Sequence, residues 1–130
     1  MNQDAYLTNP NLLNLRHCHF FSVCDGHGHY GQEVSGLLKH RLPFNVEHGL
    51  QQAGFHVPSE EGKPLDYPDF NKLHKTMTTA FADTNREVYG MVTDVRFSGS
   101  TCVSVLTFGR KIYVSNVGDS RAILIKAPNS

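Results

Sequence analysis

The first part of the chain carries two short runs that predict β-strands. Ala5–Thr8 is a run of strand-forming residues, and Asn9 and Pro10 close it. Cys18–Cys24 is apolar at both of its alternating sets of positions, which is typical of an inner strand with cover on both faces. This second run leads into Asp25–Gly31, which we interpret as a glycine-rich turn.

A helix is predicted after this turn, because apolar residues recur there at helical spacing. They are Val34, Leu37, Leu38 and Leu42, with Arg41 in the same pattern. We expect Pro43 to end this helix, since proline lacks the N–H group that a helix interior needs. Residues 44–65 contain three glycines and two prolines, so we expect mostly loop there.

A second helix is predicted up to about Tyr89, where Gly90 ends it. Asp66 is the expected N-cap, with Pro68 in the first turn and Asp69 near the positive end of the helix dipole. Its apolar stripe consists of Phe70, Leu73, Met77, Phe81 and Val88.

The last forty residues predict a meander of three antiparallel strands. Thr101–Phe108 and Lys111–Val117 are joined by the two-residue loop Gly109-Arg110. Gly118–Ser120 then leads to Arg121–Lys126, the third β-rich run. Strands, two helices and more strands follow one another along the chain. This order predicts an α+β or layered fold and not strict βαβ alternation.

Composition excludes several function classes. The chain has 130 residues, and its 12 basic and 12 acidic residues cancel, so no electrostatic footprint for nucleic acid or an anionic membrane is present. The longest apolar run is Ala122–Ile125, which is too short to cross a bilayer. No signal peptide is recognisable, and 3 cysteines are too few for a disulfide scaffold. We therefore expect a protein of the reducing cytoplasm or nucleus, without membrane insertion.

Asp25 and Gly26 are the first candidate for chemistry. An aspartate at the end of a buried strand, followed by a glycine that frees its carbonyl, suits a hard divalent cation such as Mg²⁺ or Mn²⁺. The same residues also fit an ordinary turn in which the aspartate bonds to nearby backbone. Asp119 lies at another tight strand connection, where Gly-Asp is common turn chemistry, and Asp4 by itself indicates nothing.

A zinc site is an alternative for the histidines and cysteines around the second strand. They are His17, Cys18, His19, Cys24, His27 and His29. Strand alternation sends the first two histidines to one face and the two cysteines to the other. The usual spacings of structural zinc sites are also missing, which argues against this alternative.

Four short motifs together resemble the metal-dependent protein serine/threonine phosphatases of type 2C. They occur in the family's order and cover essentially residues 2–126. They are Asn2-Gln3-Asp4, Phe21–Gly28 with Gly31, Ser98–Thr101, and Asn116–Ala122.

This resemblance implies a fold and a site. The family fold is a sandwich of two antiparallel sheets flanked by helices, with two Mg²⁺ or Mn²⁺ ions at one end and a weaker third ion. It implies that Asp25 bridges both metals, that the Gly26 carbonyl binds one of them, and that Asp4 lies in their shell. It places Asp119 in the acidic cluster and makes His27 the general acid for a phosphoserine or phosphothreonine of a protein substrate.

The chain also departs from the family pattern. Asp4, Asp25 and Asp119 bring three negative charges against the four positive charges of two divalent ions. Gln3 stands where many relatives have a glutamate, and no arginine precedes this first motif. We therefore expect residues 1–130 to be about the N-terminal half of a phosphatase domain, truncated at both ends relative to the family and inactive alone. The missing C-terminal half is then a possible partner, and a non-catalytic binding module is the alternative function.

Overall fold

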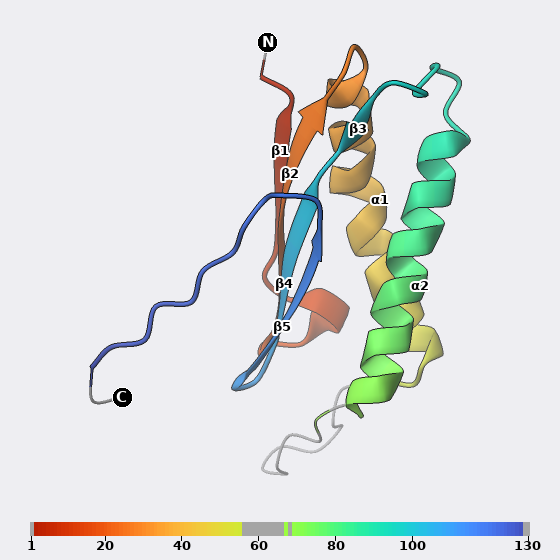
Figure 1. Ribbon diagram of the computed structural model, residues 1–130. Helices are drawn as coiled ribbons and strands as arrows, with labels where there is room; N and C mark the ends of the chain where they lie inside the picture. The colour runs from red at the N-terminus through yellow and green to blue at the C-terminus, as the bar shows by residue number, and fades with distance from the viewer. Residues whose placement is uncertain (1, 56–66, 68, 129–130) are drawn as a thin grey trace.

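The fold is one antiparallel sheet with two helices on one of its faces (Figure 1). The computed structural model describes residues 2–55, 67 and 69–128. Its strands are β1 (Asp4–Asn9), β2 (Cys18–His27), β3 (Gly99–Ser100), β4 (Cys102–Phe108) and β5 (Lys111–Val117). Its helices are η1 (Leu12–Asn14), α1 (Gly31–Gln52) and α2 (Phe70–Tyr89). The predicted α+β class is confirmed.

Strand β2 is the centre of the sheet. The strand order is β1-β2-β4-β5, and the short β3 pairs with the last residues of β2. Helix α1 packs on β1 and β2, and α2 packs on α1 (Figure 1). No helix in the described ranges is long and apolar enough to cross a membrane.

The two faces of β2 have opposite environments. Cys18, Phe20, Ser22 and Cys24 are buried toward the helices. Phe21 and Val23 point the other way and are 39% and 52% exposed. The prediction of an apolar strand on both faces is right, but the described residues cover only one of those faces.

The side of the sheet away from the helices, which we call the open face, carries exposed apolar side chains on β1, β2 and β5, whereas Val103 of β4 is buried on it. Residues that pair directly across an antiparallel sheet share a face, and the pairing groups the exposed apolar side chains together. They are Tyr6, Phe21, Val23, Ile112 and Val114. The chain beyond β5 crosses part of this face, where Arg121 and Ala122 line a shallow depression over it.

Helix α1 continues through Pro43, so the expectation that Pro43 ends it is wrong. The buried positions Val34, Leu38 and Leu42 are followed at the same four-residue spacing by Val46 and Leu50. Full burial of a valine or leucine side chain stabilises a fold by about 1.5–3 kcal/mol. Two of them offset the cost of about 3 kcal/mol for an interior proline. Residues 44–52 are therefore helix and not loop, while 56–66 lie outside the described residues.

Helix α2 begins at Phe70, with Asp69 as its N-cap. The Asp69 carboxylate accepts a hydrogen bond from the Lys72 N–H at 3.0 Å, so the expectation of a cap at Asp66 is wrong. Asp66 and Pro68 lie outside the described residues. The predicted stripe is buried at Leu73, Met77 and Val88, whereas Phe70 is 65% exposed.

The predicted hairpin is confirmed, but the third strand of the meander is not. Strands β4 and β5 pair from Phe108 and Lys111 outward, and Gly109 takes the positive φ that the tight loop requires. Residues 121–126 run as extended chain without strand pairing (Figure 1). A β-rich composition does not by itself supply a neighbouring strand, and the Ile123, Leu124 and Ile125 side chains are 77–83% exposed.

We predict that residues 1–130 alone are marginally stable, oligomeric or aggregated, because the open face and sheet edges are templates for association. A fragment carrying the rest of the domain should restore a compact species. The double substitution Ile112→Thr with Val114→Thr keeps β-branched residues and should raise the monomer fraction. Analytical ultracentrifugation with thermal unfolding measures both effects.

The matched control for this prediction is Val92→Thr, which removes a fully exposed valine beyond the end of α2. It should leave association unchanged. A cooperative, monomeric unfolding transition of the wild-type 130 residues would contradict the prediction.

Candidate active site

Asp4 and Asp25 lie directly opposite each other at one end of the sheet. They are paired in the register of β1 and β2, both are exposed, and both belong to the open face. The next pair along, Gly26 and Gln3, is hydrogen-bonded, with the Gly26 N–H donating to the Gln3 carbonyl at 3.3 Å. Asp4 and Asp25 therefore form a non-hydrogen-bonded pair, in which Cα atoms are about 4.5 Å apart and side chains lie close together.

Gly26 occupies a position that no larger residue fits. A Cβ there would lie 2.4 Å from the Gly31 carbonyl oxygen and 2.6 Å from that of Gln3. The Gln3 side chain also donates to the Gly28 carbonyl at 2.8 Å. Gln3 therefore links the start of β1, through hydrogen bonds, to the backbone that follows Asp25.

Strand β2 continues through His27, so the glycine-rich turn starts later than expected. The turn begins at Gly28, whose φ of +86° favours glycine. Asp25 and His27 are two residues apart in one strand and share the open face. The His27 ring lies against the backbone of Gly99, where an added Cβ would be 2.9 Å from His27 Nε2.

Thr101 joins the Asp25 backbone to the segment that carries Asp119. Its hydroxyl accepts from the Asp25 N–H at 3.0 Å, and its own N–H donates to the Asp25 carbonyl at 2.9 Å. The same hydroxyl is 2.6 Å from the Ser120 Oγ. Asp119 is exposed and is next to Ser120, so it belongs to the same end of the sheet.

Among the described residues, no three His, Cys, Asp or Glu side chains come together in a way that could hold a metal ion. The structure thus brings Asp4 and Asp25 together and leaves Asp119 outside a shared cluster. The zinc alternative has no cluster in this part of the chain either. His17 Nε2 is buried without a partner, His19 bonds to the Pro10 carbonyl, and burial raises the pKa of the Cys18 thiol to about 11.

The model of the family described as Protein phosphatase 2C matches residues 2–130 of this chain. The chain belongs to the protein phosphatase 2C family. The predicted resemblance is therefore confirmed.

Plant relatives and solved structures agree with this assignment. Probable protein phosphatase 2C 35 of Arabidopsis thaliana is 38% identical over 123 residues, which cover 95% of this chain and 30% of that protein. Probable protein phosphatase 2C 38 of Oryza sativa subsp. japonica is 32% identical over 151 aligned residues, covering 95% of this chain and 33% of that protein. The chain thus spans about a third of the length of the curated relatives it matches.

The structural neighbours show the fold. The serine-threonine phosphatase 2C from Toxoplasma gondii superposes with a TM-score of 0.73 at 21% identity, covering 93% of this chain and 40% of that one. The PPM Ser-Thr phosphatase from Mycobacterium smegmatis, solved in complex with cacodylate, gives a TM-score of 0.52 at 24% identity, covering 92% and 40%.

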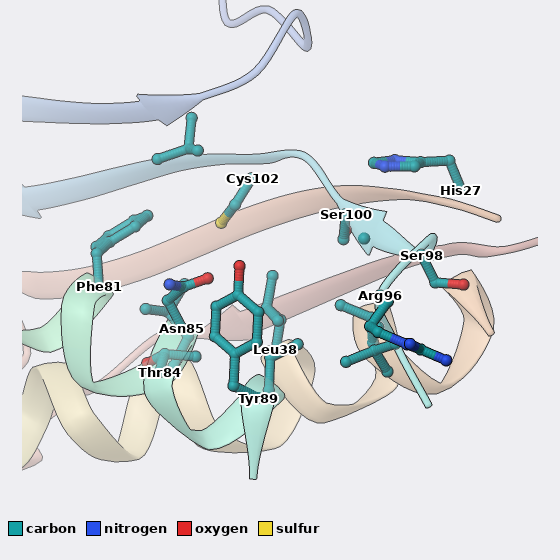
Figure 2. Close-up of a pocket in the computed structure, with 16 residues that line it drawn as sticks. His27, Leu38, Phe81, Thr84, Asn85, Tyr89, Arg96, Ser98, Ser100 and Cys102 are labelled. Carbon is teal, nitrogen blue, oxygen red and sulfur yellow. The ribbon is translucent and has the colours of Figure 1, made fainter. Parts of the chain in front are cut away.

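The sequence prediction missed a cavity of about 510 Å³ between the helices and the sheet of this phosphatase-family chain (Figure 2). His27, Ser98 and Gly99 lie at one end of it, and Cys102 and Val88 line its interior. Helix α2 packs on α1 rather than on β4 and β5, which leaves this space under the sheet. Local sequence patterns do not report where a helix fails to reach a sheet.

The buried thiols of Cys102 and Cys24 shift each other's pKa. A hydrogen bond from Cys24, with further ones from the Ser104 and Ser22 hydroxyls, lowers the pKa of the Cys102 thiol against the effect of burial. The same thiol–thiol contact, together with burial, raises the pKa of Cys24.

We predict that Thr101→Val lowers the free energy of unfolding by about 0.5–1.5 kcal/mol, the net contribution of a typical hydrogen bond, because this one is only partly buried. The Asp25 N–H loses its acceptor in this variant. Thr101→Ser keeps the hydroxyl and serves as the matched control, with a smaller loss. Urea unfolding of a protein that carries this chain and the rest of its domain, followed by circular dichroism, measures the difference. Equal stability of Thr101→Val and wild type would contradict the prediction.

Proposed function

We propose that this chain is the N-terminal part of a catalytic domain that hydrolyses phosphoserine and phosphothreonine in proteins with two Mg²⁺ or Mn²⁺ ions. The observation that carries the proposal is the pairing of Asp4 with Asp25 at one end of a protein phosphatase 2C sheet. The structural neighbours from Toxoplasma gondii and Mycobacterium smegmatis are both serine-threonine phosphatases, which supports the substrate class.

The donor groups suit hard divalent cations. Asp4 and Asp25 present exposed carboxylates, and no cation or hydrogen-bond donor among the described residues engages their side chains. Oxygen donors of this kind are the ligands that Mg²⁺ takes in proteins. We propose Asp25 as the bridging ligand, the Gly26 carbonyl as a further ligand, Asp4 in the shell around the ions, and Asp119 at the edge of the acidic cluster, beside a weaker third ion.

Divalent ions bound there would activate a water molecule and neutralise the oxygens of the phosphoryl group. The chain's own contribution is to hold two carboxylates on adjacent strands in one register. Two divalent ions need more negative charge than Asp4, Asp25 and Asp119 supply. We propose that the rest of the domain brings the further carboxylates.

His27 is the proposed general acid for the leaving serine or threonine oxygen. It shares the open face with Asp25, and Gly99 leaves room for its ring. A positioned general acid contributes about 10²–10⁴-fold to a rate. This is a small part of the acceleration of up to ~10²¹ known for phosphate-monoester hydrolysis. Most of the effect must then come from the charge around the phosphoryl group.

A protein that carries this chain and the rest of its domain should hydrolyse a phosphothreonine peptide when Mn²⁺ is present and stop when EDTA is added. Residues 1–130 alone should show no turnover above the Asp25→Ala variant. Full activity after chelation would refute a metal-dependent phosphatase. A complete domain without turnover, but with tight binding of the phosphopeptide, would favour the non-catalytic binding module.

We predict that Asp25→Ala removes more activity from the complete enzyme than His27→Ala does. Loss of the bridging carboxylate affects both ions, whereas loss of the general acid costs about 10²–10⁴-fold. Rates at saturating Mn²⁺ make the comparison, with Asp25→Asn as an isosteric control that removes only the charge. Greater residual activity in Asp25→Ala than in His27→Ala would show that Asp25 is not the bridging ligand.

We predict that Asp119→Ala raises the Mn²⁺ concentration needed for half-maximal rate without unfolding the protein. Asp119 is exposed just beyond β5, and surface substitutions of this kind change stability by less than about 1 kcal/mol. Asp83→Ala on α2 removes a partly exposed aspartate, paired with Arg86 and away from the site, and serves as the control. An unchanged Mn²⁺ requirement would show that Asp119 only forms the turn and does not contribute to metal binding.

A further inference from the structure

Two of the three cysteines of this chain face each other across neighbouring strands. Strands β2 and β4 pair Val23 with Val103, and the same register continues where β2 pairs Gly26 with Ser100. The register therefore sets Cys24 directly opposite Cys102. Both are free and buried, at 1% and 3% exposure.

The backbone hydrogen bonds show which kind of pair this is. Thr101 N–H donates to the Asp25 carbonyl at 2.9 Å, so Asp25 and Thr101 form a hydrogen-bonded pair. Such pairs alternate with non-hydrogen-bonded ones along an antiparallel ladder, and Cys24 with Cys102 is the next pair. Cα atoms in a non-hydrogen-bonded pair are about 4.5 Å apart, inside the range of about 4.4–6.8 Å that a disulfide spans.

We propose that Cys24 and Cys102 are a redox-sensitive modification site, where a hydroperoxide oxidises the two thiols to a reversible disulfide between β2 and β4. The third cysteine, Cys18, pairs with Phe108 at the far end of β2 and has no thiol opposite it. The proposal does not depend on the phosphatase activity.

The surroundings of Cys102 favour the reaction of its sulfur with the hydroperoxide. Its sulfur lies 3.1 Å from the Ser22 Oγ and 3.5 Å from the Ser104 Oγ, so two hydroxyls can donate to charge that develops on the sulfur. Figure 2 shows the Cys102 side chain pointing from its strand toward the helices, and Cys102 lines the 510 Å³ cavity there. A molecule as small as hydrogen peroxide can reach the sulfur from this cavity.

The two steps balance. The Cys102 sulfur attacks one peroxide oxygen, the O–O bond breaks, and the released hydroxide takes the thiol proton as water, which leaves a sulfenic acid. The Cys24 sulfur then attacks the Cys102 sulfur, the S–O bond breaks, and the second hydroxide leaves with the Cys24 proton as water. Two thiols lose two electrons to one peroxide. In a reducing compartment, such a disulfide is transient and is reversed by thiol exchange.

The test is oxidation with hydrogen peroxide of the 130-residue chain in the compact species that it forms with a fragment carrying the rest of the domain. The chain is then isolated for thiol counting and mass spectrometry. We expect the loss of two of the three thiols and full recovery with dithiothreitol. Chymotrypsin cleaves after Phe20 and Phe21, between Cys18 and Cys24, so the digest identifies which cysteine is linked to Cys102. The oxidised chain should also unfold at a higher temperature, because the cross-link restrains the unfolded state.

Three controls make the outcome decisive. Cys18→Ser should lose both of its remaining thiols, whereas Cys24→Ser and Cys102→Ser should form no internal cross-link. A mixture of ¹⁴N- and ¹⁵N-labelled chains should give cross-linked peptides of one label only, since the bond forms within a chain. Oxidation in urea should link all three cysteines without preference.

Four results would overturn the proposal. They are three intact thiols in the folded chain at a peroxide dose that oxidises the chain in urea, a cross-link that involves Cys18, peptides of mixed label, and oxidation of Cys102 alone without linkage to Cys24.

Discussion

The alternation of side chains along β2 is the constraint on which the rest of the structure depends. Cys24 and Gly26 face the helices, and Asp25 and His27 face the open side of the sheet. A slip of one residue would exchange the two sets and bury the carboxylate. The core on one face and the chemistry on the other are therefore specified together by the register that β2 keeps with its neighbours.

Close approach of backbone segments maintains this register at the end where Asp4 and Asp25 meet. Gly26 lies against the Gln3 and Gly31 carbonyls, and Gly28 lies against that of Phe97, where an added Cβ would be 2.3 Å from the oxygen. The site is thus positioned by backbone contacts and by the Thr101 hydroxyl. Replacing either glycine with alanine would therefore displace the strand that carries Asp25, although it changes no charge at the site.

The open face and the shortage of carboxylates have one explanation under the proposed function. A sheet with Phe21, Val23 and Val114 exposed calls for an apolar partner layer. Two divalent ions call for more negative charge than this chain provides. The chain spans about a third of its relatives' length, and we propose that the remainder supplies both. The cysteine pair lies on the covered face and needs nothing from that remainder.

The sequence by itself determined the elements whose signals are local. The alternation in β2, the two-residue loop between β4 and β5, and most of the α2 stripe are read within a few neighbouring residues, and the ordered motifs identified the family.

Tertiary structure decided the rest. Helix α1 passes Pro43 because Val46 and Leu50 find a buried surface that no local pattern reveals. The β-rich run after Ser120 stays unpaired because no described strand lies beside it. Cys24 meets Cys102, and Asp4 meets Asp25, only through strand register, which depends on contacts between residues far apart in the chain.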